Sequence, residues 1–219
     1  MAGFVEVLPP IQIEGHVSSG IGHEEHPMRI MTRRVAGLDA VGWDGKARAE
    51  VVEVFDALAP EWHTRSSPQR TAVVLDAFER GLGGNTVDNH VAIEVGSGIG
   101  SYSALIANRF DTVLSVDVSA EMVRHAPAGS TYRVLADSGL LPISDRSADA
   151  VIAINAFLFP HEVARVLRVG GTLIWVNSSG EETPIHLSTE DVVAVLPFPV
   201  EGRESRAGAG TWCVLRRTA

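Results

Sequence analysis

The chain contains one cysteine, one lysine and two tyrosines among its 219 residues. The single cysteine, Cys213, excludes an intrachain disulfide and any zinc site that is built from several cysteines. No apolar run approaches the roughly 18 residues that a membrane-spanning helix needs. The first residues lack the basic start and apolar stretch of a secretion signal. We therefore expect a cytoplasmic protein that is not inserted in a membrane.

Basic residues are also scarce, since 18 Lys and Arg stand against 27 Asp and Glu and give a formal net charge of −9. Nucleic-acid binding depends on clustered basic side chains that contact phosphates. Here the arginines are scattered, with their densest group at Arg29, Arg33 and Arg34. The composition therefore predicts a small-molecule partner and no nucleic acid. The 45% apolar and 21% charged residues are typical of a globular domain.

The N-terminal part divides into two segments. Residues 1–45 are rich in Gly, Pro and His and show no sustained periodicity, so we expect an irregular arm or lid. Helical spacing of apolar residues begins at Lys46, and Ser67 followed by Pro68 has the form of a helix start. Residues 46–84 are therefore predicted to form two cap helices.

From His90 onward, short apolar runs alternate with helical segments, and runs such as 151–154 lack polar alternation. Such runs are typical of strands that are buried on both faces of a parallel sheet. The predicted strands are 91–95, 112–117, 131–135, 149–154, 171–177, 198–204 and 210–217. The predicted helices lie near 100–108, 119–126 and 160–168, and a further helix starts at Ser188. The expected fold class is α/β, with a Rossmann-like core over 90–219. This core is a doubly wound, mostly parallel seven-stranded sheet with a C-terminal antiparallel hairpin and an N-terminal helical cap.

The most informative stretch is 91–100, where an apolar strand runs into Gly96, Gly98 and Gly100. Glycines there permit a sharp turn and let a ligand lie against the main chain, beside a helix N-terminus. In open α/β sheets, ligands bind beyond the carboxyl ends of the strands. The glycine pattern alone is also compatible with a plain tight turn.

Polar side chains follow the next three strands: Asp117, Asp137 and Asn155. Asp117 lies 21 residues beyond Gly96, and a carboxylate at this place can accept two hydrogen bonds from a ribose diol. Each of these residues by itself is equally explained as a helix cap or a turn former. Together with the glycine loop they predict a shared adenosine site.

Five segments of the chain resemble class I S-adenosylmethionine-dependent methyltransferases. They are EVGSGIG at 94–100, VDVSAEM at 116–122, ADSGLLP at 136–142, ARVLRVGG at 164–171 and FDALAPEWH at 55–63. The resemblance covers roughly residues 46–219 and implies the fold of that family over this range. It also implies S-adenosyl-L-methionine as the cofactor and S-adenosyl-L-homocysteine as the product. One departure from the family pattern is Val169, where proline is commoner.

The resemblance also implies roles for individual residues. Asp117 would hold the ribose hydroxyls, and Met122 would pack near the adenine. Asp137 would meet the exocyclic amine of the adenine, while Glu94 and the Asn155 main chain would hold the methionine amino group. The full set of implied cofactor-binding residues is Trp62, Glu94, Gly96, Ser97, Gly98, Asp117, Val118, Met122, Asp137, Ser138 and Asn155.

The acceptor side is less defined. A sulfonium is an activated methyl donor, so the main task of the protein is to align a nucleophile with it. An oxygen or nitrogen acceptor can also require a general base, for which His161 and His63 are candidates. Each is equally explained as a surface or helix-end histidine. The aromatic residues that are available for an apolar acceptor pocket are Trp43, Trp62, Phe157 and Phe159, which favours a small, partly apolar acceptor.

Other readings of the sequence stay open. His23 to His26 (HEEH), with His16 upstream, has the residue types of a metal site but no established ligand spacing, so we predict no metal. The protein is predicted to be a methyltransferase enzyme, with a non-catalytic S-adenosylmethionine-binding protein as the main alternative. A nicotinamide-dependent oxidoreductase is disfavoured, because Ser101 replaces the third small residue of the dehydrogenase fingerprint and no Tyr-x-x-x-Lys pair is present. The sequence predicts neither the oligomeric state nor the atom that is methylated.

Overall fold

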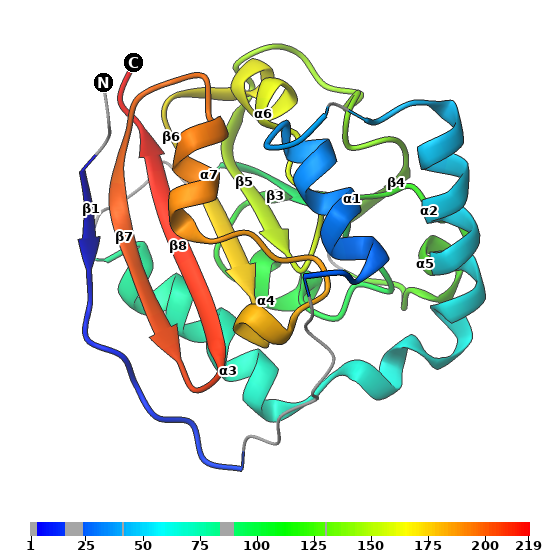
Figure 1. Cartoon of the computed structure of the whole chain (residues 1–219), viewed down its shortest axis with the longest axis horizontal. Helices are drawn as coiled ribbons and strands as arrows, with labels where there is room; N and C mark the ends of the chain where they lie inside the picture. The colour runs from blue at the N-terminus through cyan, green and yellow to red at the C-terminus, as the bar shows by residue number, and fades with distance from the viewer. Residues whose placement is uncertain (1–3, 16–23, 41, 84–89, 130) are drawn as a thin grey trace.

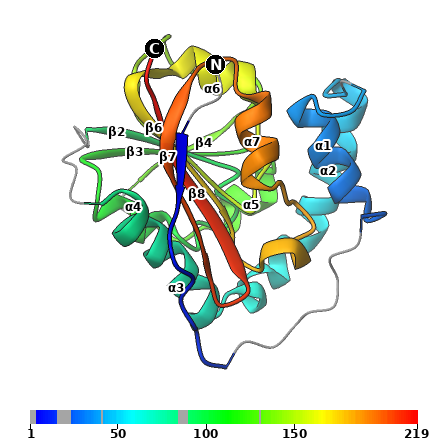
Figure 2. The same cartoon turned by 60° about the vertical axis from the view of Figure 1, so that its left-hand side comes forward.

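The computed structural model describes residues 4–15, 24–40, 42–83, 90–129 and 131–219 of the chain. Within these residues, one eight-stranded sheet lies between two layers of helices (Figures 1 and 2). The strands are β1 (Phe4–Val7), β2 (Val91–Val95), β3 (Thr112–Asp117), β4 (Tyr132–Leu135), β5 (Ala148–Ile154), β6 (Leu167–Asn177), β7 (Val200–Ala207) and β8 (Gly210–Arg217). The α-helices are α1 (Pro27–Ala36), α2 (Gly45–Leu58), α3 (Pro68–Asp76), α4 (Ser103–Ala107), α5 (Ala120–His125), α6 (Pro160–Val166) and α7 (Thr189–Val195). Short helices of other types are η1 (Ala59–Arg65), η2 (Ala77–Gly81) and η3 (Gly180–Glu182).

The strand order is β1-β7-β8-β6-β5-β2-β3-β4. Strands β2 to β6 pair in parallel, and β8 runs antiparallel to both β6 and β7. The chain builds outward in one direction from β2 and in the other direction from β5. The carboxyl ends of these two neighbours therefore lie at the topological switch point, where α/β sheets bind ligands. The predicted doubly wound, mostly parallel sheet with its antiparallel hairpin is confirmed.

The N-terminal arm differs from the expectation of an irregular segment. It contributes an eighth strand, β1, which pairs in parallel with β7 at the edge of the sheet, and a third cap helix, α1. Strand β1 is four residues long and mostly exposed, so it carries little hydrophobic pattern for sequence analysis to detect. Helix α1 is set by its ends, with Pro27 in the first turn and Gly37 at φ 81° after the last. The expectation of seven strands and two cap helices is corrected to eight and three.

Helix starts that the sequence predicts are found where local side chains cap the backbone. The Ser67 hydroxyl accepts from the Arg70 N–H at the start of α3. At α7, Ser188 and Asp191 form a capping box, each side chain accepting from the backbone N–H of the other. These local contacts need no information from distant parts of the chain, which explains why the sequence predicts them well.

Two apolar layers hold the helices on the sheet. Helices α3 and α4 pack on one face, where Val74 and Ile106 meet sheet residues such as Ile152. Helices α6 and α7 pack on the other face, where Val163 and Val192 are buried. Figure 2 shows α3 and α4 on one side of the strands and α7 on the other. Helices α1 and α2 lie next to one another, and a smaller apolar cluster that includes Met31, Val51 and Phe157 lies beneath them.

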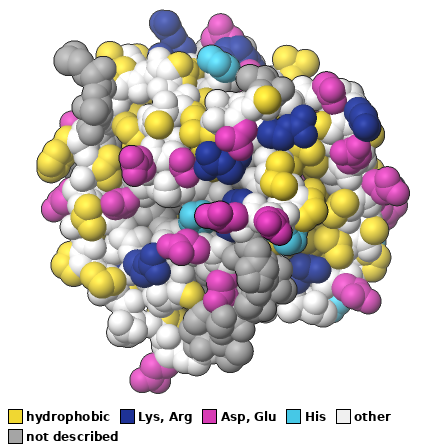
Figure 3. All heavy atoms as spheres, viewed as in Figure 1, with side chains coloured by type: hydrophobic (Ala, Val, Ile, Leu, Met, Phe, Trp, Pro, Cys, Tyr) yellow, Lys and Arg dark blue, Asp and Glu magenta, His cyan; other side chains and the backbone are white. Residues whose placement is uncertain are grey.

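The described surface is mixed in charge. On the face drawn in Figure 3, basic and acidic side chains are interspersed among apolar and neutral ones. Many of the arginines pair with nearby carboxylates, such as Arg203 with Glu6 and Arg216 with Glu201. Among the described residues, no helix combines the length and the apolar composition that crossing a bilayer requires.

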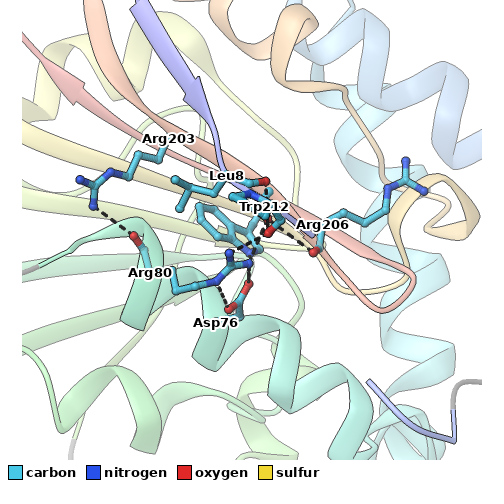
Figure 4. Close-up of polar contacts among 8 residues, drawn as sticks. Leu8, Asp76, Arg80, Arg203, Arg206 and Trp212 are labelled. Atoms are coloured by element: carbon cyan, nitrogen blue, oxygen red, sulfur yellow. Dashed lines mark hydrogen bonds and ion pairs between the residues drawn. The ribbon is translucent and has the colours of Figure 1, made fainter. Parts of the chain in front are cut away.

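A buried polar network joins the N-terminal arm to the sheet and to α3 (Figure 4). The Asp76 carboxylate accepts from Arg80 at 2.6 and 2.7 Å and from the Trp212 indole N–H at 2.7 Å. The same Arg80 guanidinium donates to the Pro9 carbonyl at 2.8 Å and to the Ser205 hydroxyl at 2.9 Å. One carboxylate and one guanidinium therefore link α3, β7, β8 and the segment that follows β1.

Candidate functional site

A cavity of about 500 Å³ lies at the carboxyl ends of the central strands, covered by α1, α2 and η1. Ten of the eleven residues that the sequence predicts to bind the cofactor line it: Trp62, Glu94, Gly96, Ser97, Gly98, Asp117, Val118, Met122, Ser138 and Asn155. They come from four strand ends, one helix and the covering segment. The fold thus brings together residues that are as much as 93 positions apart along the chain, from Trp62 to Asn155.

The glycine loop after β2 forms part of the cavity wall. Gly96 and Gly98 adopt φ values of 62° and 55°, which L side chains rarely adopt. A Cβ atom on Gly96 would lie 2.7 Å from the Cβ of Ala156, so a larger residue would displace the chain after β5. A Cβ on Gly98 would point toward Trp62 and Met122, both of which line the cavity. Glycine at these two positions keeps the main chain bare toward the cavity.

Asp117, the last residue of β3, is held in a fixed orientation by backbone donors. One carboxylate oxygen accepts from the Gly98 N–H at 2.7 Å, and the other accepts from the Ser119 N–H at 2.8 Å. The residue is 7% exposed, and burial raises the pKa of its carboxyl group. Since each carboxylate oxygen has two acceptor positions, Asp117 can take two further donors from a ligand.

Glu94 lies deeper, at the end of β2, with 3% of its surface exposed. Its Oε2 atom accepts from the hydroxyls of Ser103 at 2.6 Å and Ser115 at 2.7 Å. Burial raises the pKa of the Glu94 carboxyl group, while these two hydroxyl donors partly oppose the shift. Both hydroxyls bind the same oxygen, so a donor from a ligand would meet Oε1.

Asn155 follows β5 in a conformation that is uncommon for a residue with a side chain, at φ 52°. Its amide donates to the Ser178 hydroxyl at 2.8 Å, and the Ser178 N–H donates back to its carbonyl oxygen at 2.8 Å. This reciprocal pair ties the ends of β5 and β6 together at the cavity. Ser178 was not among the predicted site residues, although its position directly after β6 is the signal that could have found it.

Asp137 lies outside the cavity lining, unlike the other predicted cofactor residues. Its carboxylate accepts from the Trp43 indole N–H at 3.0 Å, from Arg48 at 3.2 Å and from the Gly139 N–H at 2.8 Å. The side chain therefore ties the start of α2 to the loop after β4. The contact of Asp137 with adenine stays a prediction. In the structure its carboxylate binds residues at the start of the N-terminal helical cap.

The two histidines that the sequence predicts as general bases do not line the cavity. His63 lies in η1 and His161 in the first turn of α6, and both side chains are exposed. Of the histidines that the structure describes, the one that lines the cavity is His26, at the start of α1. His16 and His23, considered as metal ligands, lie outside the described residues. The described residues contain no group of three or more His, Cys, Asp and Glu that is arranged to hold a metal ion.

The aromatic residues that the sequence assigns to an acceptor pocket all line the cavity. Trp43 packs edge-on against Phe159, with ring centroids 5.2 Å apart, and lies at a tilt to Phe157 at 5.9 Å. Trp62 packs edge-on against Phe55 at 5.6 Å. Flat apolar walls therefore surround the part of the cavity under α1 and α2.

A group of polar residues near the glycine loop was not foreseen. Arg65, Arg70 and Tyr102 line the cavity, and the Arg65 guanidinium lies 5.2 Å from the centroid of the Trp62 ring. Burial raises the pKa of the Tyr102 phenol, which hydrogen-bonds to Ser178, while the nearby positive charge of Arg70 lowers it. The arginines come from the cap and the tyrosine from the turn before α4. Only the tertiary fold brings them together.

The chain is similar to known methyltransferases in sequence over part of its length and in fold over most of it. Residues 93–175 match a family model described as a methyltransferase domain. No curated protein matches the chain in sequence. Among solved structures, DhpI in a complex with SAH is 19% identical, covering 76% of this chain and 95% of that chain with a TM-score of 0.60.

Two further structures are similar over most of their length. A SAM-dependent methyltransferase from Aquifex aeolicus is 17% identical, covering 81% of this chain and all of that chain with a TM-score of 0.55. The complex of the Haloferax volcanii Trm112 methyltransferase activator with a protein described as a methyltransferase contains a chain that is 17% identical. That match covers 75% of this chain and 98% of the other, with a TM-score of 0.60. At these identities the structures establish the fold, and the family model adds a sequence match to a methyltransferase domain over residues 93–175.

Proposed function

We propose that this chain, which carries a methyltransferase domain over residues 93–175, is an S-adenosylmethionine-dependent enzyme that methylates a small, partly apolar molecule. The observation that carries the proposal is Asp117, a buried carboxylate fixed at the cavity wall beside the bare main chain of Gly98. The resemblance in sequence predicts a ribose contact at this residue. The formal net charge of −9, with acidic and basic side chains interspersed on the face drawn in Figure 3, favours a small acceptor over a nucleic acid.

The chemistry of the cavity wall fits the adenosine part of the cofactor. Asp117 has acceptor positions for the two ribose hydroxyls, which are both donors. Trp62 and Met122 flank Gly98 and offer apolar contacts to a flat base. Val118 and Ser138 extend the same wall toward the loop after β4.

The other end of the wall fits the amino-acid part. Glu94 offers a carboxylate oxygen to an ammonium group, next to Gly96, Ser97 and the main chain of Asn155. Arg70 and Tyr102 add a cation and a hydroxyl near Ser178, a pair that suits a carboxylate. Groups of opposite charge thus face the two charged ends of an amino acid.

S-adenosylmethionine, when bound, supplies a methyl group on a sulfonium, which is activated for in-line displacement. The protein's part is to hold the acceptor in line and to keep water out, which the walls formed by Trp43, Phe157 and Phe159 would do. Alignment of the acceptor requires no general base. His161 and His63 are exposed and do not line the cavity, so a role as general base stays a prediction for both.

The first test is calorimetric titration of the protein with S-adenosylmethionine, S-adenosylhomocysteine and NAD. We expect both sulfur ligands to bind and NAD to show no binding. Asp117→Ala should weaken S-adenosylmethionine at least about tenfold, because a hydrogen bond to a charged group contributes roughly 1.5–3 kcal/mol. The matched control is Asp111→Ala, which removes an exposed carboxylate at the opposite end of β3 and should leave the affinity unchanged.

Two results would contradict the proposal. Binding of NAD in place of the sulfur ligands would favour an oxidoreductase, and equal affinity in Asp117→Ala and Asp111→Ala would remove Asp117 from the site. Turnover separates an enzyme from a binding protein. An enzyme releases S-adenosylhomocysteine in the presence of an acceptor, whereas a non-catalytic binder releases none with any acceptor that the cavity admits.

A further inference from the structure

His26 is the imidazole that the fold brings to the cavity, although sequence analysis considered it only as a metal ligand. It is half-buried, lines the cavity and is the N-cap residue of α1. Its Nδ1 atom lies 3.1 Å from the backbone nitrogen of Met28, whose N–H it accepts. Side chains that accept from the second or third helical N–H stabilise helix starts.

The cap fixes which ring nitrogen carries the proton. A backbone N–H can only donate, so Nδ1 must offer its lone pair for as long as the cap is intact. The neutral ring then carries its proton on Nε2. Capped in this way, the His26 ring has a hydrogen-bond donor at Nε2 and no lone pair there to take a proton. The ring is therefore suited to donate a hydrogen bond to a ligand atom, and it is not suited to act at Nε2 as a general base.

Hydrogen bonds from Arg29 attach helix α1 to the segment after β6, and this attachment determines the position of His26. The Arg29 guanidinium donates to three backbone carbonyls of the segment after β6, those of Glu181 at 2.5 Å, Thr183 at 2.9 Å and Pro184 at 3.3 Å. Three bonds to consecutive parts of one loop hold α1 in place over the cavity. The imidazole of His26, at the start of α1, therefore occupies a defined position.

The cavity that His26 lines also has apolar and aromatic walls. Trp43, Phe157 and Phe159 form aromatic walls, and Met28 and Ile185 line the same cavity. Binding sites of this kind use apolar walls for affinity and a few placed polar groups for orientation. Flat walls favour a planar ring, and one donor favours one acceptor atom on that ring.

We propose that the methyl acceptor is a planar ring compound that bears a nitrogen or oxygen hydrogen-bond acceptor, and that His26 selects it by donating from Nε2. This inference rests on the proposed function and adds to it the substrate class and a specificity-determining residue. It assigns His26 no proton transfer.

The test uses quinoline and naphthalene, which have nearly the same shape and differ by one ring nitrogen that accepts a hydrogen bond. Each is titrated into protein saturated with S-adenosylhomocysteine, and binding is followed by ligand-observed NMR. We expect quinoline to bind roughly fivefold more tightly than naphthalene, the effect of one neutral hydrogen bond. In His26→Ser this preference should vanish, while naphthalene binding changes less than quinoline binding.

His26→Ser is the matched variant, because serine is a preferred N-cap residue and keeps α1 capped while it removes the imidazole. His26→Ala removes both the cap and the donor, so a purely structural role predicts loss of ring binding in the Ala variant and full retention in the Ser variant. A quinoline preference that survives in His26→Ser overturns the inference. So does equal or absent binding of the two rings when S-adenosylhomocysteine binds normally. Failure of S-adenosylhomocysteine itself to bind overturns the proposed function and this inference with it.

Discussion

Glu94 is a carboxyl group buried at the end of β2, where burial raises its pKa above the ordinary value of 4.5. Because the pKa is higher in the folded state, the folded protein keeps this proton at pH values where the unfolded chain has lost it. The free energy of unfolding that Glu94 contributes therefore falls as pH rises from about 4.5 to the folded-state pKa. A carboxylate that is positioned to bind the amine of a ligand thus lowers the free energy of unfolding at neutral pH.

We predict that Glu94→Gln is more stable than the wild type near pH 7.5 and that this difference shrinks near pH 4. The Gln carbonyl oxygen can still accept from Ser103 and Ser115, so the change removes the charge and keeps the contacts. Urea unfolding at both pH values measures the difference, with the exposed Glu53→Gln as the control. A stability difference that is independent of pH would contradict this account. S-adenosylmethionine affinity should fall in the same variant.

Individual residues differ in how well the sequence predicts them. Asp117 was predictable because it ends β3, so the strand pattern alone places it at the carboxyl edge of the sheet. Glu94, the penultimate residue of β2, was predicted only through the family resemblance. Asp137 also follows a strand, but its partners Trp43 and Arg48 precede it by 94 and 89 residues. No local sequence pattern predicts a contact between residues that are so far apart along the chain. His26 was missed for the same reason, since only the packing of α1 turns a helix cap into a cavity wall.

Among the elements, the strands and α-helices from residue 46 onward were predicted, whereas β1 and α1 in the N-terminal arm were missed. Strands β2, β3 and β8 were predicted with their observed bounds, because their apolar residues follow the pattern of a sheet. Helix α1 has buried residues at helical spacing, Met31, Thr32, Val35 and Ala36, but it is short and lies in a segment whose Gly, Pro and His content favoured an irregular arm. Its place over the cavity depends on Arg29 and on carbonyls that lie about 150 residues away in the chain.

This dependence predicts that Arg29→Lys loosens α1. A lysine can place one ammonium near the three carbonyls but cannot reach them with a planar fork of donors. We expect amide hydrogen exchange in α1 to become at least about fivefold faster, since hydrogen bonds from a charged donor are lost. The control is Arg124→Lys, an exposed position whose guanidinium pairs with Glu121 within α5. Unchanged protection of α1 in Arg29→Lys would show that packing alone holds this helix.

At the scale of the whole molecule, the centre of the sheet and its β1 edge are stabilised by different interactions. The central strands are buried between apolar layers, whereas β1 is mostly exposed and pairs through four residues. The sequence predicts the central part because burial on both faces leaves a continuous apolar pattern. The attachment of the N-terminal arm depends instead on the network of Asp76, Arg80, Ser205 and Trp212, which joins four parts of the chain (Figure 4).

We predict that Asp76→Asn lowers the free energy of unfolding by about 3 kcal/mol, near the lower end for breaking a buried ion pair, since the Arg80 side chain is 28% exposed. Asparagine keeps the volume of the side chain and can still accept from Trp212, so the loss reports the unpaired charge of Arg80. The control is Asp145→Asn, where the paired carboxylate is 75% exposed and the expected loss is below about 1 kcal/mol. Chemical unfolding measures both variants, and equal small losses would contradict a stabilising role for the network. Because Arg80 also holds the Pro9 carbonyl, Asp76→Asn should speed amide exchange in β1 more than in β4, the strand at the opposite edge of the sheet.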